Sequence, residues 1–136
     1  MLKVRKSSPL FRLAAKSDVM TRVDFLNSGT GQTPPVVPSM IVMTITDGTA
    51  CPGVADLDPA RDALVVIVNA DKASHPMSIS GSTGFTLHTV LKNSADPVVR
   101  TASFSAGTFT VPARTTAVFE QLQSGAQGAG LPCNTR

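Results

Sequence analysis

The sequence has no tryptophan and no tyrosine, and its only aromatic residues are six phenylalanines. Carbohydrate-binding surfaces generally use exposed Trp or Tyr, which combine a flat apolar ring with a polar group. The composition therefore disfavours sugar binding by stacking. The phenylalanines fall at alternating positions of expected strands, and this placement favours core packing over a binding platform.

Charged residues are also scarce, at 15% of the 136 residues, and no apolar run approaches the ~20 residues that cross a membrane. The basic beginning lacks the hydrophobic stretch of a signal peptide, so an export signal of a parent protein would lie outside this chain. The net charge of +3 comes from the opening segment, where the basic residues that precede the first acid, Asp18, are Lys3, Arg5, Lys6, Arg12 and Lys16. The rest of the chain is mildly acidic, so we expect neither nucleic acid nor a membrane as a partner.

What the chain does contain is a series of short apolar segments separated by turn residues. The pattern predicts strands over residues 19–27, 40–46, 63–69, 77–80, 85–90, 98–104, 109–111 and 115–121. Residues 63–69, ALVVIVN, are almost continuously apolar, which predicts a central strand with both faces covered. Gly- and Pro-containing loops are expected at residues 28–39 and 47–62, and no helical period appears after the opening. We predict an all-β fold, an antiparallel β-sandwich of Greek-key type with about eight strands, preceded by a short helical stub.

The stub is predicted from the first residues of the chain. Residues 3–8 are typical of a last helical turn, because Lys and Arg lie where a helix C-terminus favours cations, and Pro9 ends it. We therefore expect a helix end and connector over residues 1–18, a β-sandwich domain over 19–123 and an irregular, Gly-rich tail over 124–136.

No constellation of catalytic residues is evident. His75 precedes Pro76 in an expected turn, and His88 lies in an expected strand, where it is interpreted as a surface or satisfied core histidine. Glu120 is the only glutamate, and it shows no facing carboxylate of the kind that glycoside hydrolysis requires. We assign no catalytic residue and no cofactor site.

Four aspartates lie close together in residues 47–62: Asp47, Asp56, Asp58 and Asp62. Alternate carboxylates can converge on a hard cation, but the spacing is not that of a calcium loop and Pro59 interrupts it. The interpretation as a solvated turn is favoured over a metal site.

Two cysteines, Cys51 and Cys133, lie in expected loops. They would form one disulfide in an oxidising compartment or remain as two free thiols, and the sequence leaves both alternatives open because it does not give the separation of their Cα atoms. No zinc-ligand spacing accompanies them.

Seven segments, taken in order, resemble a known family. They are LKVRKSSPLFRL, RVDFLNSG, MIVMTITDG, LDPARDALVVIVNA, GFTLHTVLKNSADPVVRTASF, GTFTVPARTTAVFEQ and SGAQGAGLP. Together they resemble the end of pullulanase-type α-1,6-glucosidases, the starch-debranching members of the α-amylase superfamily. In that family the first segment ends the last helix of a catalytic (β/α)₈ barrel and leads into a C-terminal β domain.

The resemblance implies a non-catalytic domain that packs on the barrel and stabilises it, with the catalytic carboxylates outside this chain. The expected partner is the barrel of the parent enzyme, and the isolated domain is expected to self-associate weakly or to cover its exposed patch with the opening segment. We expect the parent to be secreted or held at the cell surface. The alternative is a stand-alone β-sandwich module that binds carbohydrate or protein.

Overall fold

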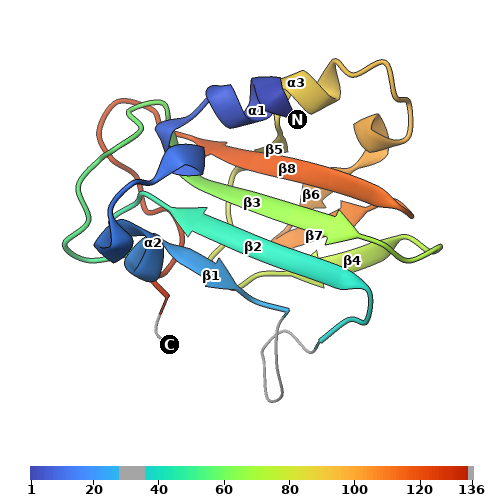
Figure 1. Ribbon diagram of the computed structural model, residues 1–136, viewed down its shortest axis with the longest axis horizontal. Helices are drawn as coiled ribbons and strands as arrows, with labels where there is room; N and C mark the ends of the chain where they lie inside the picture. Colours follow the sequence, from blue (N-terminus) through green and yellow to red (C-terminus); the bar gives the residue numbers. More distant parts are fainter. Residues whose placement is uncertain (28–35, 135–136) are drawn as a thin grey trace.

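The computed structural model describes residues 1–27 and 36–134, and in this part of the chain eight strands form two antiparallel sheets (Figure 1). The larger sheet has the order β1-β2-β3-β8-β5, and the smaller has the order β4-β7-β6. The strands are β1 Val23–Phe25, β2 Met40–Thr46, β3 Arg61–Asn69, β4 His75–Ser78, β5 Phe85–Leu87, β6 Ser103–Ser105, β7 Thr108–Val111 and β8 Thr115–Leu122. The predicted antiparallel β-sandwich is confirmed, while the loop predicted over 28–39 lies largely outside the described residues.

The apolar run in β3 forms the centre of the larger sheet. β3 pairs with β2 on one side, where Ile45 faces Leu64, and with β8 on the other, where Val65 faces Phe119. Its alternate residues point to opposite faces, and both faces find apolar neighbours. This accounts for the lack of a hydrophobic–polar alternation in this strand.

The main core lies between the two sheets. Four of the six phenylalanines meet there, and their ring centroids are 4.6 to 5.7 Å apart: Phe85, Phe104, Phe109 and Phe119. Most of these pairs have the edge-to-face geometry that aromatic rings prefer. These rings are therefore core side chains.

Short helices replace parts of three predicted strands. α2, Lys16–Arg22, occupies the first part of the strand predicted over 19–27, because Asp18 and Arg22 suit the two helix ends and form an i,i+4 ion pair of 3.0 Å. The strand predicted over 85–90 ends at Leu87 and is followed by α3, Thr89–Lys92. A 3₁₀ turn, Val99–Thr101, begins the segment predicted as a strand over 98–104. The expectation of no helix after the opening was therefore wrong.

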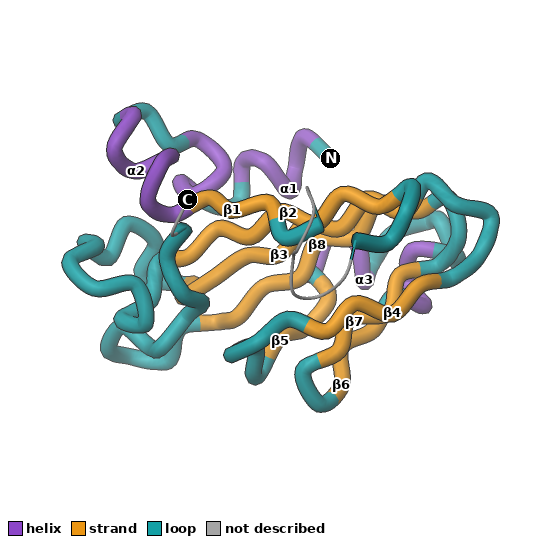
Figure 2. Tube along the Cα trace, turned by 90° about the horizontal axis from the view of Figure 1, so that it is seen from below, coloured by secondary structure: helices purple, strands orange, loops and turns teal. Residues whose placement is uncertain are grey.

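The opening segment packs on the outer face of the larger sheet, the face turned away from β4, β7 and β6 (Figure 2). It consists of α1, Leu2–Lys6, and a 3₁₀ turn at Pro9–Arg12. Leu10 is 1% exposed against Ile45 and Leu64, and Val4 packs with Leu91 and Val118. Burying a leucine side chain in this way stabilises a fold by about 1.5–3 kcal/mol. The helical stub is therefore an integral part of the packed structure.

The Gly-rich tail is irregular but tightly packed. Gly130 has a φ of +65°, and a Cβ atom there would lie 2.7 Å from the Asp62 carbonyl oxygen and from the Gly48 Cα. The contact allows the next residue, Leu131, to enter the core with 2% exposure. Glycine is needed here for its backbone conformation and for the close approach of two backbones.

Candidate functional site

The two cysteines are joined in the structure. The Cα atoms of Cys51 and Cys133 lie 4.6 Å apart and the side chains form a disulfide, which ties the loop after β2 to the tail after β8. Cys51 is 1% exposed. Beyond the disulfide, the backbone N–H of Asn134 donates to the Thr21 carbonyl oxygen at 2.9 Å, so the tail also contacts α2.

The aspartates of the long loop are mostly buried, which corrects their interpretation as a solvated turn. Asp47, Asp58 and Asp62 are at most 5% exposed, and only Asp56 of the four faces solvent. The Asp62 carboxylate accepts a hydrogen bond of 2.6 Å from the Gly128 N–H, because the tail passes directly over it. Their carboxylates are used to fix the loop and the tail, and across residues 1–27 and 36–134 no group of three or more His, Cys, Asp or Glu could hold a metal ion.

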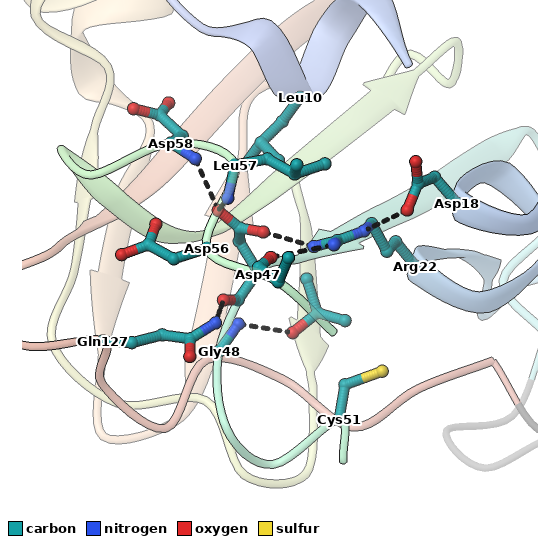
Figure 3. Close-up of polar contacts among 12 residues, drawn as sticks. Leu10, Asp18, Arg22, Asp47, Gly48, Cys51, Asp56, Leu57, Asp58 and Gln127 are labelled. Carbon is teal, nitrogen blue, oxygen red and sulfur yellow. Dashed lines mark hydrogen bonds and ion pairs between the residues drawn. The ribbon is translucent and has the colours of Figure 1, made fainter. Parts of the chain in front are cut away.

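Arg22 and Asp47 form a buried ion pair at the end of α2 (Figure 3). Arg22 also donates to the Asp18 carboxylate at 3.0 Å and to the Ala55 carbonyl oxygen at 2.8 Å. The second carboxylate oxygen of Asp47 accepts from the backbone N–H of Leu57 at 2.9 Å and of Asp58 at 2.7 Å. Burial raises the pKa of Asp47, and the backbone donors and the Arg22 guanidinium oppose that rise.

A second polar cluster holds the opening segment to the sandwich. The Ser8 hydroxyl donates to the Asp58 carboxylate at 2.5 Å, and Arg61 donates to the Ser7 carbonyl oxygen at 3.1 Å. Arg61 also pairs with Glu120 at 2.7 Å, and its contact with Asp58 is 3.4 Å. Because Asp58 belongs to both clusters, one continuous set of polar contacts links α2, the opening segment and strands β3 and β8. We call this set the polar joint: Ser7, Ser8, Arg22, Asp47, Asp58, Arg61, His88 and Glu120.

His88 is the histidine of the joint, and it lies at the N-cap of α3 rather than inside a strand. Its Nδ1 accepts from the Val90 N–H at 3.1 Å, so the neutral ring carries its proton on Nε2. Nε2 lies 2.8 Å from the Ser7 hydroxyl oxygen, and that hydroxyl donates onward to the Val4 carbonyl oxygen at 2.7 Å. Burial lowers the pKa of His88; the nearby Glu120 opposes this and Arg61 adds to it.

Ser7, His88 and Glu120 contain the residue types of a hydrolase triad, but their geometry is different. In a triad the acid orients the histidine through the nitrogen opposite the nucleophile. Here Glu120 lies 3.7 Å from Nε2, the nitrogen that already contacts Ser7, and a backbone N–H occupies Nδ1. The Ser7 proton is directed to a carbonyl oxygen, and His88 is 2% exposed. The arrangement holds the opening segment in place and does not form a nucleophile–base pair.

The other histidine of the chain, His75, lies apart from the polar joint. His75 begins β4 and contacts Asp71 at 2.7 Å, and this hydrogen bond lowers the pKa of Asp71. The contact closes the turn between β3 and β4. Sequence reasoning did not single out Ser7, Ser8, Arg22 or Arg61; one available signal was Ser8 before Pro9, a pattern typical of a helix N-cap.

Comparisons with known proteins give consistent matches. The family described as "Alpha-1,6-glucosidases, pullulanase-type, C-terminal" matches residues 1–122. Pullulanase 1, chloroplastic, of Arabidopsis thaliana is 42% identical over 131 residues, covering 92% of this chain and 13% of the relative. Pullulanase of Klebsiella pneumoniae is 40% identical over 142 residues, covering 100% of this chain and 12% of the relative.

A solved structure matches as well. The crystal structure of PulA from Klebsiella oxytoca superposes with a TM-score of 0.81 at 40% identity, over 98% of this chain and 12% of that one. The chain therefore spans about an eighth of the length of these relatives. No helix in the described part of the chain is long and apolar enough to span a bilayer.

Proposed function

Since this chain belongs to the family of C-terminal domains of pullulanase-type α-1,6-glucosidases, we propose that it is a non-catalytic domain that packs on the catalytic barrel of a parent enzyme and stabilises it. The parent would hydrolyse α-1,6-glucosidic links in pullulan or starch, and its catalytic carboxylates would lie in the part of the protein outside this chain.

The polar joint is the observation that carries this proposal. A buried network of charged and hydroxyl groups holds the opening segment on the sandwich, because the Ser8 hydroxyl donates to Asp58 and Arg61 donates to the Ser7 carbonyl oxygen. Hydrogen bonds to charged groups typically stabilise a fold by about 1.5–3 kcal/mol each, so together these contacts favour a rigid connection. A rigid connection is suited to a domain that must hold a fixed position against its neighbour.

The test is to produce the parent enzyme with and without residues 17–136. Loss of the sandwich should lower thermal stability and solubility, because the barrel surface that the domain covers becomes exposed. Addition of the separately produced domain is the control, since it should restore part of the stability. The proposal is wrong if thermal stability, solubility and α-1,6 hydrolysis are all unchanged by the deletion.

The alternative, a module that binds α-glucan, makes a different prediction for the same material. Four phenylalanines are committed to the core, and the chain has neither Trp nor Tyr to form a stacking platform. A titration of the domain with maltooligosaccharides or pullulan distinguishes the two. Saturable binding would favour the alternative.

We also propose that the parent enzyme is exported. The support is the Cys51–Cys133 disulfide, because structural disulfides persist mainly in oxidising compartments. Thiol counting on protein from the native host, separated into cell and medium fractions, tests this. Two reduced thiols in a purely intracellular protein would contradict it.

A further inference from the structure

The outer face of the larger sheet is covered only in part. The opening segment buries Ile45 and Leu64 at one end of this face. Toward the other end, the strand register places Ile41, Val68 and Thr116 in one row across β2, β3 and β8. Among residues 1–27 and 36–134, no segment buries Ile41, which remains 55% exposed.

A hollow of about 340 Å³ joins the covered and uncovered parts. The opening segment and the strands β2, β3 and β8 line it with Met1, Val4, Arg5, Phe11, Met43, Val66, Thr116 and Val118. The lining is apolar except for Arg5 and Thr116, and α1 also presents the exposed Lys3 and Lys6. The surface is thus an apolar strip with a basic border. We call it the outer strip, defined by Ile41, Met43, Val66, Val68 and Thr116.

We propose that the outer strip, with the hollow beside α1, is the surface that packs against the catalytic part of the parent enzyme. This inference rests on the proposed function and deepens it, because it selects one face of the sandwich. On this proposal the sheet β4-β7-β6 is not the docking face, and its outward side chains, such as Ser78, stay in solvent.

The position of α1 identifies the occupant. The chain spans 12–13% of the length of its pullulanase relatives and matches their C-terminal family, so the remainder of a parent would precede Met1. Met1 itself lines the hollow. A polypeptide continuing from α1 would therefore leave the domain beside the outer strip, which places the preceding helices of the barrel within reach of it.

Chemical complementarity defines what those helices must present. An apolar patch should cover Ile41 and Met43, and carboxylates at its edge should face the basic residues of α1. Interfaces between domains of one chain typically bury ~600–1,500 Å², an area that one sheet face can supply. A second copy of this chain would instead bring two basic borders together, which opposes the charge pattern.

The test uses cysteine labelling in the full parent enzyme. Ile41→Cys is compared with Ser78→Cys, a matched strand position on the exposed side of β4 in the other sheet. The probe is a water-soluble maleimide, added in short pulses to the native enzyme and to a denatured sample. Thr116→Cys repeats the measurement from β8, in case the first variant does not fold.

We expect labelling at Ile41→Cys to be about tenfold slower or more than at Ser78→Cys in the native enzyme, because the core of an interface excludes water. In the denatured samples the two rates should be equal. Equal labelling rates in the native enzyme would overturn the inference. Protection of Ile41→Cys that is lost on dilution would also overturn it, because it identifies a second copy as the occupant. Protection that requires added pullulan would overturn it as well, because it identifies a glucan-binding surface. A deletion of residues 17–136 that destabilises the parent, combined with equal labelling, refutes only the choice of face; a deletion without effect refutes the proposed function.

Discussion

Reduction of the Cys51–Cys133 disulfide should strongly destabilise this domain. The bridge closes a loop with a sequence separation of 82 residues, which contains β3 to β8 and thus most of the sandwich. In the chain-entropy description, a loop of this size restricts the unfolded chain enough to stabilise the fold by roughly 4.5 kcal/mol. With a urea dependence of about 2 kcal/mol per molar for a small protein, the unfolding midpoint should fall by roughly 2 M.

The assay is urea unfolding followed by far-UV circular dichroism, because the chain has no Trp or Tyr for intrinsic fluorescence. Cys51 is 1% exposed, so the protein is reduced while unfolded and then refolded with the reductant present. A variant with Cys51→Ala and Cys133→Ala is the control. Its unfolding midpoint should equal that of the reduced protein and should not change when reductant is added. A midpoint shift below roughly 0.5 M would refute the reasoning, since it corresponds to only about 1 kcal/mol.

Three other substitutions test the remaining features. Leu10→Ala should lower the free energy of unfolding by about 2–5 kcal/mol. The control, Leu2→Ala at a residue 77% exposed, should change it by less than about 0.5 kcal/mol. Similar losses of stability in the two variants would mean that the opening segment does not pack on the sheet. His88→Asn should flatten the pH dependence of thermal stability below about pH 6.5. The folded-state pKa of His88 is lowered from 6.5, so its contribution is complete above that pH and is lost as the pH falls, and an unchanged slope would contradict this. Gly130→Ala should lower the free energy of unfolding, measured with urea, by about 1–3 kcal/mol or more. The loss should be smaller for Gly125→Ala, because Gly125 also has a positive φ but has no atom close to the position of a Cβ.

The longest strands were predictable from sequence because their own apolar and β-branched residues distinguish them from the turns on either side. Met40–Thr46 has the predicted bounds, and β8 extends the predicted strand by one residue. β3 begins two residues early, at Arg61, where the pairing with β8 contains an irregularity. The covered second face of β3 was also predicted, since a strand without polar alternation needs neighbours on both sides.

The helices and the polar joint were not predictable in the same way. Arg22 alternates with Val23 and so resembles a strand residue, but its contact with Asp47, 25 residues away, requires it at the end of α2. The joint depends on contacts between residues far apart in sequence: Ser8 with Asp58, Arg61 with Glu120, and Ser7 with His88, which is 81 residues away. Periodicity describes only neighbouring residues, so tertiary contacts of this range are outside its reach.

The sheet order has a consequence for how the domain is made. β3, the centre of the larger sheet, has β8 as one of its two partners, and the tail that follows β8 supplies Leu131 to the core and Cys133 to the disulfide. A ribosome delivers the chain from the N-terminus, so β3 emerges after its partner β2 but before β8 and the tail. A polypeptide that stops short of residue 131 therefore lacks both Leu131 in the core and the Cys51–Cys133 bridge, so the packing described above is complete only after residue 133 has been added.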